Sequence, residues 1–217
     1  MFKAITAAEA AALVPDGASV MIGGFMGAGT PERIIDALVA RGARGLTIIA
    51  NDTAFPGVGI GKLIDAGCVT HVVASHIGTN PVTQKKMIAN EITVELVPQG
   101  TLIERIRAAG SGLGGVLTPT GLGTVVEDEK PVIEVDGEKF LLEKPLRADF
   151  ALLHAHEADY NGNLTYRLTA ANFNPIIAFA AAVTIAEPHQ IVPVGVIPPD
   201  AVRTPGVIID HLVERPR

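Results

Sequence analysis

Four glycines within seven residues, placed between an apolar segment and a proline, are the pattern in this chain that points most clearly to chemistry. The glycines are Gly23, Gly24, Gly27 and Gly29. They follow the apolar residues 19–22, and the order predicts a buried strand, a glycine loop and a helix whose first residue is Pro31, with Thr30 as its N-cap. Such a turn can present free backbone N–H groups to a phosphate or a developing oxyanion, although an ordinary tight turn is the plainer alternative.

Two side-chain amides, Asn51 and Gln99, occupy matching places after the second and fourth predicted strands. Because the carboxyl ends of parallel strands meet at one edge of a sheet, we expect them to converge with the glycine loop and with residues 75–80. Amides can donate hydrogen bonds to a carbonyl or carboxylate oxygen. They could equally satisfy the backbone of their own loops, where asparagine is common.

Apolar runs of strand length alternate with helix-like segments along the first half of the chain. Strands are expected at 18–22, 46–50, 68–74 and 92–97, and helices at 31–41, 59–66, 81–89 (with Asn80 as the cap) and 102–108. Strands that are apolar throughout are typical of parallel sheets buried on both faces. The sequence therefore predicts an α/β fold, with an open, mostly parallel sheet and helices on both faces, in one domain covering residues 1–217.

The alternation breaks after residue 109. Residues 110–124 contain six glycines and are predicted to form a long loop. The Gly110–Gly115 run does not fit a dinucleotide fingerprint, because it follows a predicted helix instead of a strand. Residues 131–142 indicate a small antiparallel hairpin around Asp136-Gly137. Beyond it we expect strands at 148–154 and 183–186, a turn at 159–163, a helix at 175–182 and an extended surface tail over 188–205, which contains five prolines.

Composition excludes several classes of function. The net charge of −6 without a basic cluster disfavours nucleic-acid binding. No apolar run is long enough for a transmembrane helix, and Glu9 interrupts any signal-peptide core, so a cytoplasmic location with no membrane partner is expected. The single cysteine, Cys68, is expected to be a buried small hydrophobe. His154 and His156 should share one face of a strand, but no third ligand lies nearby, so no metal site is predicted.

The chain has a glycine loop and amide donors but no evident nucleophile. It contains no Gly-x-Ser-x-Gly elbow, and no Walker lysine follows the first glycine loop.

Residues 16–31 resemble the signature of the alpha subunits of type I coenzyme A transferases, in particular those that act on acetate and acetoacetate. The resemblance continues at 49–53, 75–81, 97–107, 118–127, 146–149, 171–175 and 204–206, and so covers nearly the whole chain.

This resemblance implies a CoA-transferase-like fold and a ping-pong transfer of CoA from an acyl-CoA to a short-chain carboxylate. A glutamate attacks the thioester, and the reaction passes through an anhydride to an enzyme-bound thioester. In the family that glutamate belongs to a Ser-Glu-Asn-Gly motif of the beta subunit, which this sequence lacks. A beta-subunit partner in a two-plus-two heterotetramer is therefore implied, with CoA as a substrate and no resident cofactor. A site sealed between subunits would keep the thioester from water.

The resemblance also assigns roles to residues. It implies CoA binding by the loop residues Gly23, Gly24, Phe25, Met26, Gly27, Ala28 and Gly29. It implies that Gln99 and Asn51 are catalytic and stabilise the anhydride or the oxyanion. Three other functions stay open: a transferase for 3-oxoadipate or another 3-oxo acid, a stand-alone module that binds a phosphorylated metabolite or an acyl-CoA, and a sugar-phosphate isomerase. The last would need Asp52, the only strand-end carboxylate, as its acid or base.

Overall fold

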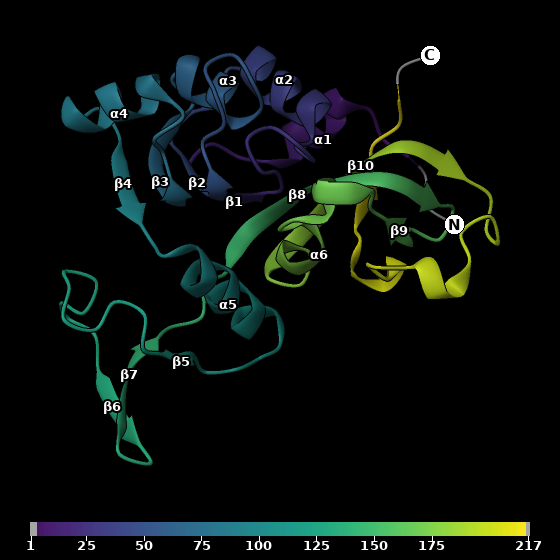
Figure 1. Ribbon diagram of the computed structural model, residues 1–217. Coiled ribbons are helices and arrows are strands. Elements are labelled where there is room, and N and C mark those ends of the chain that lie inside the picture. The colour runs from purple at the N-terminus through teal and green to yellow at the C-terminus, as the bar shows by residue number, and fades with distance from the viewer. Residues whose placement is uncertain (1–3, 216–217) are drawn as a thin grey trace.

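The protein is described by a computed structural model over residues 4–215. The main sheet follows the strand order β11-β10-β8-β1-β2-β3-β4, and β9 pairs with β8 off this path (Figure 1). The strands are β1 Ser19–Ile22, β2 Leu46–Asp52, β3 Val69–His76, β4 Thr93–Leu96, β8 Ala148–Asp159, β9 Leu164–Thr165, β10 Ala181–Val192 and β11 His211–Leu212. Every neighbouring pair along the path is parallel, and only the β8–β9 pair is antiparallel among these described strands. The predicted open, mostly parallel sheet is confirmed.

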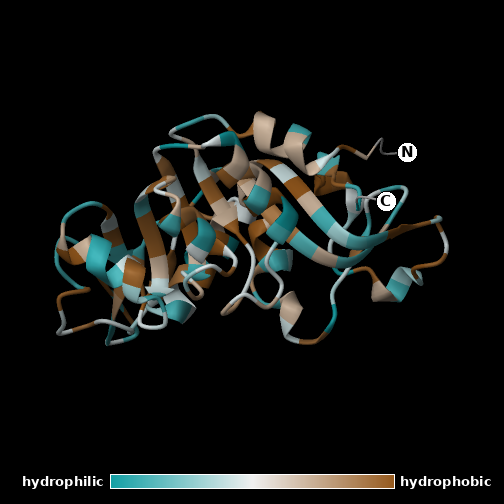
Figure 2. Cartoon of the chain, turned by 90° about the horizontal axis from the view of Figure 1, so that it is seen from above, coloured by the Kyte–Doolittle hydropathy of each residue, from teal (hydrophilic) through white to brown (hydrophobic). Residues whose placement is uncertain are grey.

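Helices cover both faces of the sheet, as predicted. One face carries α1 Ala7–Leu13, α2 Glu32–Arg41, α3 Ile60–Asp65 and α4 Pro81–Ile88, and the other carries α5 Gln99–Gly110 and α6 Asn174–Ile177. Side chains alternate between the two layers, so that Ile48 packs on the first face and its neighbour Ile49 on the second. Both are buried, which is why the apolar residues of β2 are not restricted to alternate positions. Figure 2 shows hydrophobic segments along the central strands.

The direction of the strand order reverses between β1 and β8. From β1 the chain builds outward through β2, β3 and β4, and it then returns to the other side of β1 to add β8, β10 and β11. In parallel sheets a crevice opens at such a switch point, beyond the carboxyl ends of the strands, and ligands bind there. The glycine loop follows β1 and therefore lies at this point.

A three-stranded antiparallel arm projects from the body beside α5 (Figure 1). It consists of β5 Val116–Thr118, β6 Val132–Val135 and β7 Glu138–Glu143. The predicted hairpin is confirmed, and Asp136 and Gly137 both have positive φ, as a two-residue hairpin turn requires. The predicted long loop over 110–124 is corrected, because Val116–Thr118 in this segment form β5, which pairs with β7.

The C-terminal predictions underestimate strand length. β8 and β10 remain paired through Asp159 and Val192, well past the predicted ends at 154 and 186. Pro188 fits inside β10 because β11 pairs only with Ile185 and Ala186, so the proline lies where that edge has no partner strand. The predicted helix over 175–182 is present but shorter: α6 covers Asn174–Ile177, and β10 begins at Ala181.

The expected extended tail over 188–205 is also corrected. Its first part is strand β10, and a short 3₁₀ helix, Pro199–Ala201, follows. A second such helix, Gly206–Ile208, leads to β11. Within residues 4–215, no helix has the length and apolar character needed to cross a membrane.

Candidate active site

The glycine loop after β1 is held rigidly by the rest of the chain. Phe25 and Ala28 exchange backbone hydrogen bonds of 3.0 and 2.9 Å across the turn. The Gly23 N–H donates to the Leu152 carbonyl of β8, and the Gly24 N–H donates to the Asn172 side chain at 3.1 Å. The expected concave surface of free N–H groups is therefore wrong for most of this loop, because the protein itself already occupies those donors.

Asp52, at the end of β2, anchors the tip of the loop. Its carboxylate accepts hydrogen bonds from the N–H of Met26 at 3.0 and 3.2 Å and from the N–H of Ala54 at 2.7 Å. Met26 and Ala54 both have left-handed backbone conformations, with φ of 50° and 52°, which cost side-chain-bearing residues free energy. The buried carboxylate holds both residues in place. Asp52 is thus a structural acceptor, and an isomerase-type acid or base role does not fit it.

Two asparagines after β8, Asn172 and Asn174, clamp the loop from the other side. Besides accepting from Gly24, Asn172 donates to the Ala28 carbonyl at 2.9 Å. Asn174 is completely buried and donates to the Gly29 carbonyl at 2.8 Å, while its oxygen accepts from the His154 N–H. A Cβ at Gly23 would lie 1.8 Å from the Asn174 Oδ1, so this close approach requires glycine. The sequence analysis included residues 171–175 in the family resemblance but did not predict that Asn172 and Asn174 hold the glycine loop.

The N-terminus of α2 is occupied by a protein carboxylate. Glu187, buried on β10, accepts from the N–H of Ile34 at 2.8 Å and of Arg33 at 3.2 Å. The predicted cap Thr30 makes no capping bond, because α2 begins at Glu32 and the N-cap position is Pro31. Burial raises the pKa of Glu187, while Arg33 and the two N–H groups oppose that rise. This helix terminus is therefore not available to an anionic ligand.

The two predicted catalytic amides are brought together. Gln99 Nε2 donates to Asn51 Oδ1 at 2.6 Å, and Asn51 Nδ2 donates to Asp52 at 2.8 Å. Asn51 is buried as a residue of β2 itself, whereas Gln99 is exposed in the first turn of α5, where a loop was predicted. Ser75, at the end of β3, fixes Asn51 further by donating to its backbone oxygen at 2.7 Å.

The glycine loop and the amide pair border one hollow of about 260 Å³. Its lining residues are Phe25, Asn51, Gln99, Gly100, Ile103, Asn172 and Phe173. Aromatic and aliphatic side chains form its walls and amides its polar groups, and none of these lining residues is an acid. We call this space the amide hollow. It can orient a small acyl group and stabilise an oxyanion, but it contains no nucleophile of its own.

The remaining polar candidates lie away from the amide hollow. Cys68 is buried, as expected, and burial raises the pKa of its thiol, which makes it a poor nucleophile. His154 and His156 lie on one face of β8, as predicted, where the His156 ring stacks on His189 with 6.2 Å between ring centroids. Burial lowers the pKa of His154. The glycine-rich run over 110–115 begins at the last residue of α5 and leads into β5, so it opens no helix.

A protein-family model described as "Coenzyme A transferase" matches residues 4–215. The chain belongs to the coenzyme A transferase family. It is 56% identical to the acetate CoA-transferase subunit alpha of Escherichia coli K12, over 97% of this chain and 96% of that protein. It is 51% identical to the alpha subunit of the acetoacetyl-CoA:acetate/butyrate CoA transferase of Clostridium acetobutylicum, over 93% and 92% of the two chains.

A solved structure extends the comparison to the fold of this CoA transferase. An acyl-CoA transferase of E. coli O157:H7, in a thioester complex with CoA, superposes with a TM-score of 0.87 at 25% identity. The match covers 98% of this chain and 47% of the other, so this chain spans about half the length of that protein. The family membership expected from residues 16–31 is confirmed.

Proposed function

We propose that this chain is the alpha subunit of a heteromeric CoA-transferase that moves CoA from an acyl-CoA to a short-chain carboxylate such as acetate or acetoacetate. The observation that carries the proposal is the amide hollow, which places paired amides beside a clamped glycine loop but has no acid in its lining. Asp52, the carboxylate nearest the amides, is fully engaged in holding the loop. The relatives named above are alpha subunits, which supports a partner that supplies the nucleophile.

The proposed chemistry uses a glutamate of the beta subunit. Its carboxylate oxygen attacks the thioester carbon of the acyl-CoA, and the CoA thiolate leaves, which forms a mixed anhydride. The thiolate then attacks the glutamyl carbonyl carbon and releases the first carboxylate, which leaves a thioester on the enzyme. An incoming carboxylate reverses both steps. Each step passes through an oxyanion that hydrogen-bond donors must stabilise.

The amide pair is suited to that role. Each amide nitrogen carries two N–H groups. One N–H of Gln99 is used on Asn51, and one N–H of Asn51 is used on Asp52. The second N–H of each has no acceptor among the described residues and remains for the substrate. The pair is preorganised, because Ser75 and Asp52 fix Asn51, and Asn51 fixes Gln99.

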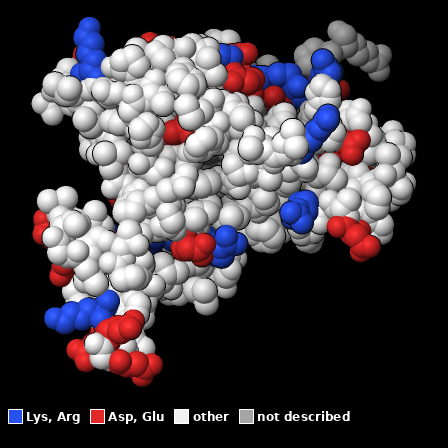
Figure 3. Space-filling view, viewed as in Figure 1, with Lys and Arg blue, Asp and Glu red and all other residues white. Residues whose placement is uncertain are grey.

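The surface around the glycine loop suits a partner subunit. Phe25 and Met26 are 43% and 39% exposed, and the nearby Phe55 and Val58 are 38% and 39% exposed. In Figure 3 charged side chains gather at the tip of the arm and are scattered over the rest of this face, with uncharged surface between them. A partner that covers these side chains would bury apolar area and exclude water from the thioester.

The test is CoA exchange between acetyl-CoA and a panel of carboxylates, with the chain alone and with a beta subunit that carries Ser-Glu-Asn-Gly. We expect exchange only in the mixture. Gln99→Ala should lower its kcat by about 100- to 1000-fold, as loss of an oxyanion donor does. Gln190→Ala, which removes an exposed amide bonded only to Glu157, is the matched control and should leave kcat unchanged.

Each other outcome has a distinct meaning. Exchange by the chain alone would reveal a nucleophile within it and would overturn the subunit assignment. A preference for 3-oxoadipate over acetate and acetoacetate would assign the chain to 3-oxo acid transfer. Acyl-CoA binding without exchange in any mixture would identify a stand-alone binding module.

A further inference from the structure

A second hollow, of about 360 Å³, lies where α5 and the segment around α6 pack together (Figure 1). We call it the arginine hollow, and its lining residues are Arg107, Ser111, Pro175, Ile176, Phe179 and Arg203. It shares no lining residue with the amide hollow. The amide hollow uses the first turns of α5, from Gln99 to Ile103, whereas the arginine hollow uses the last turn and the residue after it. The two spaces are therefore separate sites along one helix.

Arg203 brings a free guanidinium to the arginine hollow on a fixed backbone. Its N–H donates to the Leu164 carbonyl at 2.9 Å, and the next residue, Thr204, is buried with its hydroxyl 2.7 Å from the Tyr166 hydroxyl. Among the described residues, no carboxylate forms an ion pair with the Arg203 side chain. This cation is positioned by its backbone and has no counter-ion within the chain as described.

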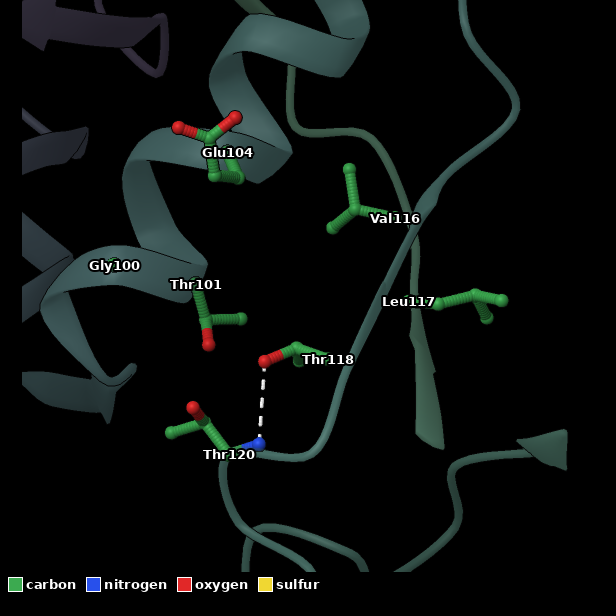
Figure 4. A pocket seen from close by; sticks show the side chains of 7 residues that line it. All are labelled: Gly100, Thr101, Glu104, Val116, Leu117, Thr118 and Thr120. Atoms are coloured by element: carbon green, nitrogen blue, oxygen red, sulfur yellow. Dashed lines mark hydrogen bonds between the residues drawn. The ribbon is translucent and has the colours of Figure 1, made fainter. Parts of the chain in front are cut away.

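Arg107 adds a second guanidinium that is only partly engaged. Its Nε donates to the Glu104 carboxylate at 3.0 and 3.2 Å, and its two terminal nitrogens have no acceptor in the described part of the chain. Glu104 lines a different hollow, shown in Figure 4, together with Thr118 and Thr120. The acid of this pair therefore lines one hollow and the cation lines the other. The arginine hollow has two guanidiniums and no acid in its lining, in a chain with a net charge of −6.

The other wall of the arginine hollow is apolar. Pro175, Ile176 and Phe179 form it, and Phe179 is 46% exposed. The base of this aromatic side chain is held in place, because the Phe179 N–H donates to the Ile176 carbonyl at 3.2 Å and α5 approaches closely at Gly110. A Cβ at Gly110 would lie 2.6 Å from the Phe179 Cβ. The hollow thus sets a rigid apolar surface opposite two cations.

This combination selects the class of ligand. A guanidinium presents forked N–H donors that match the two oxygens of a carboxylate or of a phosphate. Inorganic phosphate would use the cations and leave the apolar wall in water. A carboxylate with an apolar tail uses both walls, because its tail removes the exposed Phe179 surface from water.

We propose that the arginine hollow is a binding site for a monocarboxylate with an aliphatic tail of several carbons. Arg203 and Arg107 bind the carboxylate, the Ser111 hydroxyl donates to it, and the tail packs on Phe179 and Ile176. This site lies outside the amide hollow, and the inference does not rest on the transferase function.

Titration calorimetry with hexanoate on the full chain, without CoA or a beta subunit, tests the proposal. Arg203→Gln should weaken hexanoate binding about tenfold, the effect of losing a charged hydrogen bond, and Arg203→Lys should weaken it less. Arg147→Gln is the matched control, because Arg147 is also exposed and free of ion pairs among the described residues but does not line the hollow. It should bind hexanoate as wild type does, and so should Gln99→Ala, which alters the amide hollow.

The tail and the carboxylate can be tested apart. Acetate should bind at least about tenfold more weakly than hexanoate, because each buried methylene adds to the affinity. Equal hexanoate binding by wild type and Arg203→Gln would overturn the proposal, as would its loss in Gln99→Ala or tighter binding of inorganic phosphate. Loss of hexanoate binding when a beta subunit is added would also overturn it, because a subunit would then cover the hollow. None of these results depends on CoA exchange, so the transferase function stands or falls separately.

Discussion

The turn from β1 to α2 and the turn from β4 to α5 lie at the same edge of the sheet but use their backbone donors in opposite ways. In the first, side chains or carbonyls of the protein accept most of the loop N–H groups, and Glu187 occupies the start of α2. In the second, Pro98 leaves the start of α5 uncapped, and Thr101 lacks a partner. A glycine-rich turn can therefore reflect close packing of the backbone. The N–H groups that have no acceptor among the described residues lie instead at the start of α5, where Gly100 is the one glycine of the first turn.

The largest effect should come from removing the anchor of the β1–α2 turn. Asp52→Ala leaves the N–H groups of Met26 and Ala54 without their acceptor, and both residues have left-handed backbones. We expect the free energy of unfolding to fall by about 3 kcal/mol in urea titrations. Asp65→Ala is the control, because Asp65 is exposed and accepts one loop N–H, that of Gly57. This variant should lower the free energy of unfolding by less than about 1 kcal/mol. Equal losses in the two variants would show that the loop is not specially clamped.

A pair of glycine substitutions should separate the two turns directly. Gly23→Ala places a Cβ 1.8 Å from the buried Asn174 Oδ1, whereas a Cβ at Gly100 meets nothing within 4 Å. Gly23→Ala should lower the free energy of unfolding by about 2–3 kcal/mol, the cost of overpacking. Gly100→Ala, in the first turn of a helix, should leave stability within about 1 kcal/mol of wild type, on the stabilising side. Similar losses at both positions would remove the contrast between the turns.

The smallest effect concerns pH at the start of α2. Because the pKa of Glu187 is raised, its carboxyl group stays protonated to a higher pH in the native state than in the unfolded chain. The resulting stabilisation is complete below the usual glutamate pKa and is lost as the pH rises through the raised pKa. As the pH rises through that window, the free energy of unfolding of wild type should therefore fall relative to that of Glu187→Gln. Below and above the window the difference between the two variants should not change with pH. A difference that is constant with pH would contradict the raised pKa.

Much of the fold could be predicted from local patterns. Runs rich in apolar residues identified β1 to β4, and Asp136-Gly137 identified the hairpin, because both signals depend on neighbouring residues. The sequence pattern did not predict the C-terminal ends of β8 and β10, because residues such as His156 and Pro188 break the apolar pattern. These ends are strands because β8 and β10 pair with each other along their whole length.

The candidate site was predictable in part for the same reason. Asn51 and Gln99 could be expected to meet, since each lies close to the carboxyl end of a parallel strand, and Gln99 Nε2 lies 2.6 Å from Asn51 Oδ1. The acceptors of the loop and of the start of α2 could not be inferred, because Asp52, Asn172 and Glu187 reach them from other parts of the chain. Whether a backbone donor is free depends on those acceptors and not on the glycines beside it.

The clamp on the glycine loop also bears on when the site forms during folding. The bond from Gly24 to Asn172 spans 148 residues, and that from Asn174 to Gly29 spans 145. Contacts of such sequence separation close large loops and form slowly. During synthesis β1 to β4 can pair as soon as they emerge and Asp52 can hold the tip of the loop, but the contacts from Asn172 and Asn174 must wait until the last third of the chain has been made. A chain that ends before β8 would therefore have four of the eight strands of the main sheet and lack the asparagines that hold the glycine loop.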